Sequence, residues 1–152
     1  MSLAVFRADA MPALGGGHVV RCLTLASELR RRGWRIGFAA RFESAATVPS
    51  LLAPDVDLLN LQEGFGDDCS AMASHWQAGC DLFVLDHYEL GIEYEQACRG
   101  WANQILVLDD APARPHHCDL LLDPSPGRTG TDYSAFVGAQ CRTLCGTGYA
   151  LL

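Results

Sequence analysis

The chain has 152 residues, 49% of them hydrophobic, with 18 acidic and 11 basic side chains and a formal net charge of −7. This length suffices for one domain with a substantial core, and the negative charge argues against nucleic-acid binding, which depends on Lys and Arg neutralising phosphates. No apolar run approaches the roughly 20 residues that cross a bilayer, so we expect a cytoplasmic protein without a membrane partner.

Seven cysteines are scattered along the chain without a CxxC pair, so we expect reduced, buried thiols. The alternative is a metal site near the C-terminal end, but the spacing there matches neither a zinc ribbon nor a zinc finger. The candidate ligands of that alternative are His116, His117, Cys118, Cys141 and Cys145. The favoured prediction is a protein without a metal or a cofactor.

The first third of the chain predicts a strand, a glycine turn and a helix. The apolar run LAVFRA at 3–8 favours a strand, and MPALGGG at 11–17 favours a turn. Apolar residues then recur every three or four positions over 19–29, which is typical of an amphipathic helix, and Gly33 ends it. The next elements are predicted as a strand at 34–41, a weak helix at 44–53 and a strand at 56–61.

Two more helix and strand cycles follow. The predicted helices lie at 67–79 and 91–103 and the predicted strands at 81–88, 104–110 and 118–123. Apolar strands that alternate with helices indicate a parallel sheet covered on both faces. The predicted fold class is therefore α/β, a Rossmann-like doubly wound sheet. From residue 124 the chain is rich in turn formers, with one short helical pattern at 133–137.

Polar groups follow the first predicted strand, at the edge where doubly wound sheets bind ligands. The turn Gly15–Gly17 lacks the third glycine of a dinucleotide fingerprint and the lysine of a P-loop. It opens a helix whose free N–H groups favour an anion or an electronegative group. The helix dipole disfavours the imidazolium, so His18 is predicted to be neutral and suited to act as a general base. A tight turn with a structural histidine is the alternative.

Polar groups also follow the fourth and fifth predicted strands, as Asp86-His87-Tyr88 and Asp109-Asp110. Carboxylates cannot stay buried without partners. They could bind a ligand or cap the next turn, and both readings remain open. His116 and His117 lie in a polar stretch and are predicted to be solvated.

Together these motifs resemble the PseG-type hydrolases of the pseudaminic acid pathway, which act on UDP-2,4-diacetamido-2,4,6-trideoxy-β-L-altropyranose. The matching segments are RADAMPALGGGHVVRCLTLASELRRRGW, DLFVLDHYELGIEYEQACR, QILVLDDAPARPHHCDLLLD, DYSAFV and CRTLCGTGYALL. That family resembles MurG-like GT-B glycosyltransferases, in which two Rossmann-like domains face a cleft. The resemblance implies that residues 1–152 form the N-terminal, sugar-side domain and that a C-terminal nucleotide-binding domain is absent from this sequence.

The resemblance also implies roles for individual residues. His18 would activate water, and Tyr88 would orient the water or the sugar. The implied substrate-binding residues are Asp9, Gly15, Gly16, Gly17, Arg21, Asp86, His87 and Asp110. The sequence departs from the family pattern before the glycine turn, after LLD and before YALL, at Met11, Pro124, Ser125, Thr147 and Gly148. These departures leave the sugar specificity open.

The implied reaction is hydrolysis of a UDP-sugar at the anomeric carbon with inversion. We expect the 152 residues alone to be inactive, to expose an apolar patch at 146–152 and to self-associate through it. Two alternatives remain. One is a glycosyltransferase half in which His18 deprotonates an acceptor hydroxyl, and the other is a non-catalytic module that binds a sugar or a nucleotide.

Overall fold

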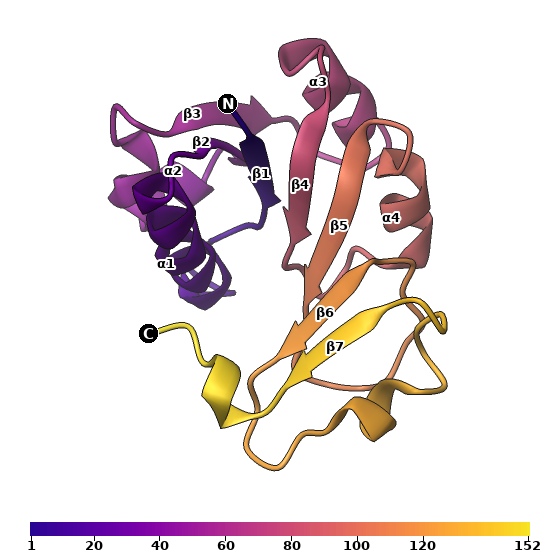
Figure 1. Ribbon diagram of the computed structural model, residues 1–152. Coiled ribbons are helices and arrows are strands. Elements are labelled where there is room, and N and C mark those ends of the chain that lie inside the picture. The colour runs from indigo at the N-terminus through magenta and orange to yellow at the C-terminus, as the bar shows by residue number, and fades with distance from the viewer.

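The computed structural model describes residues 1–152, which form one seven-stranded sheet with every pair of neighbouring strands parallel (Figure 1). The strands are β1 (Leu3–Arg7), β2 (Arg35–Arg41), β3 (Asp57–Leu61), β4 (Cys80–Leu85), β5 (Ala102–Leu108), β6 (Leu120–Asp123) and β7 (Arg142–Cys145). Their order is β3-β2-β1-β4-β5-β6-β7. The strand order therefore reverses between β1 and β4, and the predicted doubly wound α/β class is confirmed.

Helices lie on both faces of the sheet. They are α1 (Gly17–Arg31), α2 (Ser44–Thr47), α3 (Asp68–His75) and α4 (Ile92–Cys98), with short 3₁₀ turns at Pro49–Leu52, Gly130–Tyr133 and Thr147–Tyr149. Figure 1 places α1 and α2 on one face and α3 and α4 on the other. None of these helices is long and apolar enough to cross a membrane.

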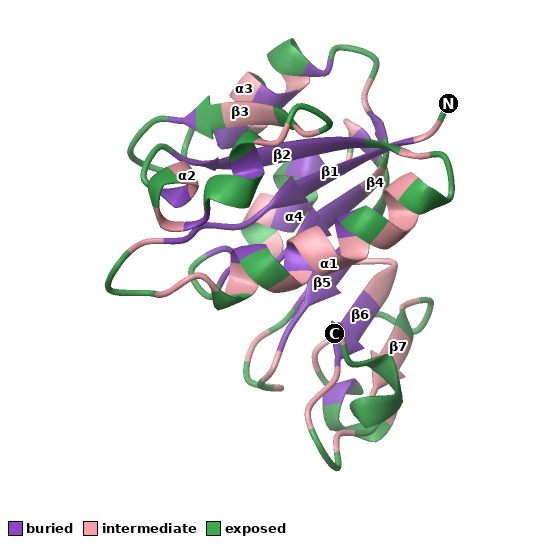
Figure 2. Ribbon diagram, turned by 90° about the vertical axis from the view of Figure 1, so that its left-hand side faces the viewer, coloured by how far each residue is buried: buried purple, intermediate pink, exposed green.

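The sheet separates two hydrophobic cores because successive side chains of a strand point to opposite faces. Phe6 packs with Phe38 and with the inner face of α1, whereas Val5 packs with α3 residues such as Met72. The rings of Phe6 and Phe38 stack with their centroids 5.9 Å apart. Figure 2 shows buried residues concentrated in the central strands and exposed residues on the outer faces of the helices. The carboxyl ends of the central strands are thus held on a rigid base.

The glycine turn leads directly into α1, as predicted. Gly15 has a φ of +82°, which glycine adopts most readily. A Cβ on Gly16 would lie 2.9 Å from Cγ2 of Val48, so the turn packs closely against the segment after α2. Gly17 has open space around its missing side chain and begins the helix. The helix ends at Arg31, and Gly33 follows it with a φ of +90°.

The structure corrects several predicted boundaries. Helix α4 ends at Cys98 and β5 begins at Ala102, so the predicted helix at 91–103 runs into the strand. Pro49 divides the predicted helix at 44–53, since proline disfavours a helical conformation in the residue before it. The short helical pattern at 133–137 is instead a 3₁₀ turn that starts at Gly130. Strand β7 was not predicted, because its four residues are only half buried at the edge of the sheet.

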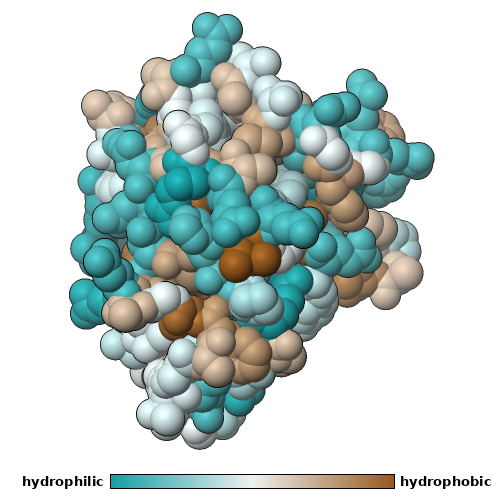
Figure 3. Space-filling view, turned by 90° about the vertical axis from the view of Figure 1, so that its right-hand side faces the viewer, coloured by the Kyte–Doolittle hydropathy of each residue, from teal (hydrophilic) through white to brown (hydrophobic).

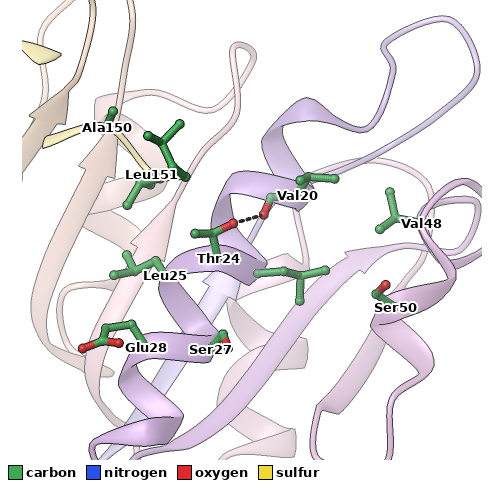
Figure 4. Close-up of a pocket in the computed structure, with 11 residues that line it drawn as sticks. Val20, Thr24, Leu25, Ser27, Glu28, Val48, Ser50, Ala150 and Leu151 are labelled. Atoms are coloured by element: carbon green, nitrogen blue, oxygen red, sulfur yellow. Dashed lines mark hydrogen bonds between the residues drawn. The ribbon is translucent and has the colours of Figure 1, made fainter.

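The C-terminal segment returns toward α1 (Figure 1). A cavity of about 700 Å³ lies between the exposed side of α1 and residues 150–152. In Figure 4, Leu25 and Leu151 lie on one side of α1, and Val48 lies on the other side. Leu151 packs against the core, while Tyr149 and Leu152 are exposed. The apolar patch predicted at 146–152 is therefore partly covered by α1, and self-association stays a prediction.

The face that carries α4 has a different character. Figure 3 shows hydrophilic residues over most of it, with hydrophobic residues in small separate groups. The predicted functional residues lie elsewhere, at the carboxyl ends of β1 and β4.

Candidate active site

The reversal of strand order between β1 and β4 brings the glycine turn beside the segment Asp86-His87-Tyr88. His18 lies in the first turn of α1, after β1, and Asp86 directly follows β4. Nδ1 of His18 lies 2.7 Å from Oδ1 of Asp86. A carboxylate can only accept a hydrogen bond, so this contact places the imidazole proton on Nδ1. Nε2 then has a free lone pair, and no other protein group bonds to it.

Asp86 is itself held firmly. Its side chain is buried, and the guanidinium of Arg21 donates from Nη2 to Oδ1 at 2.6 Å and from Nε to Oδ2. Arg21 lies one turn after His18 on α1. A paired and buried carboxylate keeps one orientation, and it therefore fixes both the tautomer and the direction of the His18 ring.

Tyr88 forms the opposite wall. Its ring meets the His18 ring edge to face, with the centroids 4.6 Å apart. Its hydroxyl donates to Oδ2 of Asp110 at 2.5 Å, and this hydrogen bond, with some burial, raises the pKa of Tyr88 above its usual value. The phenol is therefore protonated at neutral pH and has its hydrogen turned toward Asp110. Its oxygen can still accept a hydrogen bond.

Sequence reasoning missed Arg114, which holds the loop that carries Tyr88. The guanidinium of Arg114 donates to the backbone oxygens of His87 at 2.8 Å and of Tyr88 at 2.5 Å. Two donors in one rigid fork fix the path of the loop. The sequence offers no signal for this contact, since the arginine lies in a polar stretch after β5 and joins backbone atoms.

His87 differs from His18 because both of its ring nitrogens are engaged. Nε2 pairs with Oδ2 of Asp9 at 2.8 Å, and Nδ1 accepts from the backbone N–H of Glu89 at 3.0 Å. Asp9 is fully buried and also accepts from Nη1 of Arg7 at 2.8 Å. Burial alone would raise the pKa of Asp9, but the hydrogen bonds from His87 and Arg7 hold it well below its usual value. Asp9 is therefore a buried, charged carboxylate that fixes the orientation of the His87 ring.

A pocket of about 330 Å³ opens between the glycine turn and the segment after β4, a size typical of small-molecule sites. The lining residues are Met11, Ala13, Leu14, His18, Phe65, His87, Tyr88 and Glu89. Of the predicted site residues, His18, His87 and Tyr88 line this pocket. Asp86 and Asp110 do not line it, but they form hydrogen bonds with His18 and Tyr88. The N-cap residue Gly16 makes no side-chain cap, so backbone N–H groups at the start of α1 stay free for a ligand.

The structure contradicts the prediction that His116 is solvated. Its side chain is wholly buried, with Nδ1 2.7 Å from Oε2 of Glu95 and Nε2 3.2 Å from Oδ2 of Asp109. Two carboxylates from α4 and from the end of β5 can be buried only with a cation between them, and His116 provides it. His117 is exposed, as predicted.

All seven cysteines are free thiols, although only Cys22, Cys80 and Cys98 are buried. The sulfurs of Cys118 and Cys141 lie 3.7 Å apart. No three His, Cys, Asp or Glu side chains come together in a group that could hold a metal ion. His116 is also engaged by its two carboxylates, so the alternative set of ligands is not assembled.

No protein-family model matches the chain. The chain is 25% identical, over 148 residues, to the UDP-2,4-diacetamido-2,4,6-trideoxy-β-L-altropyranose hydrolase of Campylobacter jejuni subsp. jejuni serotype O:2. This similarity covers 97% of the chain and 51% of the relative. The chain thus spans about half the length of that protein and corresponds to its N-terminal half. The resemblance seen in the motifs is confirmed: the chain is a distant relative of an enzyme that hydrolyses a UDP-sugar.

Proposed function

We propose that the protein hydrolyses a UDP-linked 2,4-diacetamido-2,4,6-trideoxy sugar at the anomeric carbon, and that residues 1–152 supply the sugar-side wall of the active site. The observation that carries the proposal is the contact between His18 and Asp86, which leaves Nε2 of His18 free beside a pocket. The substrate named for the Campylobacter relative supports the choice of sugar nucleotide.

In the proposed reaction, Nε2 of His18 takes a proton from a water molecule as the oxygen of that water attacks the anomeric carbon. The bond between this carbon and the UDP oxygen breaks, and UDP leaves with the electron pair. Asp86 stabilises the imidazolium that forms, because its carboxylate already accepts from Nδ1. Attack from the face opposite UDP inverts the anomeric configuration.

Two other features of the site fit this reaction. The hydroxyl oxygen of Tyr88 can accept a hydrogen bond from the water or from a sugar hydroxyl, since its own proton is given to Asp110. The free N–H groups and the positive dipole end of α1 favour negative charge near Gly17. They can therefore stabilise charge that develops on the leaving group.

We further propose that most of the UDP contacts come from a second domain, which corresponds to the other half of the relative. The 152-residue chain alone should then bind UDP weakly and release no sugar. Isothermal titration calorimetry with UDP tests this. Tight binding by the 152 residues would favour the module that binds a sugar or a nucleotide without catalysis.

The main test is His18→Ala in a polypeptide that continues through the second domain. UDP release from the purified substrate should fall about 10²–10⁴-fold, the usual contribution of a general base. His75→Ala is the matched control, because His75 also pairs with an aspartate, at 2.9 Å from Asp57, but lies exposed on α3. Near-normal UDP release by the His18 variant would falsify the role of His18.

Product analysis separates hydrolysis from transfer. Without any acceptor, the unsubstituted polypeptide that includes the second domain, in ¹⁸O-labelled water, should release free sugar that carries the label at the anomeric carbon. Proton NMR recorded early in the reaction should show the inverted anomer. A requirement for an added acceptor hydroxyl would instead favour a glycosyltransferase.

A further inference from the structure

Arg41, the last residue of β2, has buried hydrogen-bond donors without acceptors. Its side chain is 7% exposed, yet neither Nη1 nor Nη2 finds a hydrogen-bond partner. The carboxylate that faces it, on Asp68, has its Oδ1 4.0 Å from Nη1, which is too long for a hydrogen bond. Buried donors of a charged group are costly when unpaired. Such donors are therefore candidates for pairing with a ligand.

The unpaired nitrogens of Arg41 need a neutral hydrogen-bond acceptor and not an anion. Arg41 and Arg7 share a buried cluster with Asp9 and Asp68, so two guanidinium groups face two carboxylates. His87, which also touches this cluster, donates from Nε2 and accepts at Nδ1, as a neutral imidazole does. Formal charges therefore cancel. A neutral oxygen, such as an amide carbonyl, fits better than an anion, since an anion would leave an excess negative charge.

One aromatic ring separates Arg41 from the candidate active site. The guanidinium carbon lies 4.4 Å from the centroid of the Phe65 ring. Phe65 lines the pocket that holds His18, and its ring meets His87 edge to face at 5.5 Å. A shift of Phe65 would therefore open a direct path from the pocket to Nη1 and Nη2.

The loop that carries Phe65 has room to shift. It spans residues 62–67, between β3 and α3, and contains Gly64 with a φ of +84°. A cavity of about 460 Å³ lies against Gly64, Gly66 and Asp67, and another of about 420 Å³ lies against Phe65 and Gly66. With the pocket beside His18, open space surrounds the loop from three directions.

We propose that Arg41 recognises an acylamino group of the sugar: Phe65 moves aside, and Nη1 and Nη2 donate to the carbonyl oxygen of that group. A carbonyl oxygen has two lone pairs and can accept from both nitrogens. This inference rests on the proposed function for the class of ligand, since the substrate named for the relative carries two acetamido groups. It assigns one of them a place beneath Phe65.

The test uses ¹⁵N NMR of the 152-residue chain, following the Nε–Hε signal of Arg41, which Arg41→Lys identifies. The probes are N-acetylglucosamine, glucose and sodium acetate. N-acetylglucosamine should shift the Arg41 signal in a saturable manner, whereas glucose, which has a hydroxyl in place of the acetamido group, should not. No response to N-acetylglucosamine, or an equal response to glucose or acetate, overturns the proposal.

A second measurement separates recognition from a structural role. Arg41→Lys keeps the positive charge that balances Asp9 and Asp68, so the thermal midpoint should change little. It lacks the two parallel donors of the guanidinium and should weaken binding of N-acetylglucosamine about 10–100-fold. Arg35→Met, at the exposed start of the same strand, should change neither quantity. If Arg41→Lys changes neither the thermal midpoint nor the binding of N-acetylglucosamine, recognition by the Arg41 guanidinium is rejected.

The outcome does not depend on catalysis by His18. In His18→Ala protein the Arg41 signal should respond to N-acetylglucosamine as before. Loss of hydrolysis in His18→Ala with this response retained supports the inference. Normal hydrolysis by the unsubstituted polypeptide that includes the second domain, without any response at Arg41, rejects the inference and leaves the proposed reaction standing.

Discussion

His18 and His116 both bind carboxylates, and they differ in the state of the second ring nitrogen. Nδ1 of His18 donates a hydrogen bond to Asp86, and Nε2 has no protein partner and lies beside a pocket. His116 has both nitrogens between Glu95 and Asp109, with no exposed side-chain surface. The first arrangement can exchange a proton with a ligand, and the second can only hold structural elements together.

The charge state of His116 fits its structural role. Burial alone lowers the pKa of His116, but the hydrogen bonds with Asp109 and Glu95 outweigh it and raise the pKa to about 9. His116 is therefore a cation at neutral pH, fixed between α4 and the loop that follows β5. A histidine that takes a proton from a ligand needs a free ring nitrogen at an open side, which is the arrangement at His18.

Asp86→Asn tests the site half of this comparison and has the largest expected effect. An amide can donate to Nδ1 of His18 and turn the imidazole proton to Nε2, the wrong tautomer for a base. Hydrolysis by a polypeptide that includes the second domain should fall about 10²–10⁴-fold. In the 152-residue chain, imidazole ¹⁵N shifts should show the change of tautomer. Asp57→Asn, at the exposed pair with His75, is the control and should leave hydrolysis unchanged.

His116→Ala tests the structural half. It leaves Glu95 and Asp109 buried without their cation, so the free energy of unfolding should fall by about 3–5 kcal/mol. Urea denaturation measures this, and the loss should shrink at acidic pH as the carboxylates take up protons. His117→Ala, one residue away and exposed, should change stability by less than about 0.5 kcal/mol. Equal effects of the two substitutions would contradict the buried cluster.

The pH dependence of stability gives a somewhat smaller effect. Folding raises the pKa of His116 from about 6.5 to about 9, so its contribution is complete below pH 6.5 and is lost as the pH rises through 9. The free energy of unfolding should therefore fall by about 2–3 kcal/mol between pH 6.5 and pH 9. His116→Ala should lack this part of the slope. Parallel curves for the two proteins would show that another group titrates there.

Much of the architecture was predictable, because each buried strand is an apolar run that ends at polar residues. The runs before His18 and before Asp86-His87-Tyr88 mark two strands, and in a doubly wound sheet their carboxyl ends share one edge. The contact between His18 and Asp86 was not predictable, because it joins residues 68 positions apart and depends on how α1 lies over the sheet. The sequence therefore predicted the edge but not the pair.

Sequence reasoning was weakest for polar side chains that are buried in the structure. His116 and His117 are adjacent in a polar stretch, and nothing local shows that only the first turns inward to Glu95. Arg41 reads as the polar end of a strand, although its side chain is buried. Buried charges follow partners distant in sequence, whereas apolar periodicity is local, and that difference sets the limit of sequence reasoning for this chain.

The glycine turn offers the smallest effects and the closest view of the site. Gly15→Ala must adopt a φ of +82° and should cost about 1–2 kcal/mol. Gly17→Ala meets no atom within 4 Å, and it should leave stability unchanged or raise it by up to about 1 kcal/mol.

Folding alone gives no reason for glycine at position 17, since its φ is not positive and space is open around it. Close approach of a ligand to the start of α1 would give one. Gly17→Ala should therefore raise KM for the sugar nucleotide severalfold while urea denaturation shows a fully stable protein. An unchanged KM would show that the ligand does not contact the start of α1. The water activated by His18 would then lie on the Tyr88 side of the pocket.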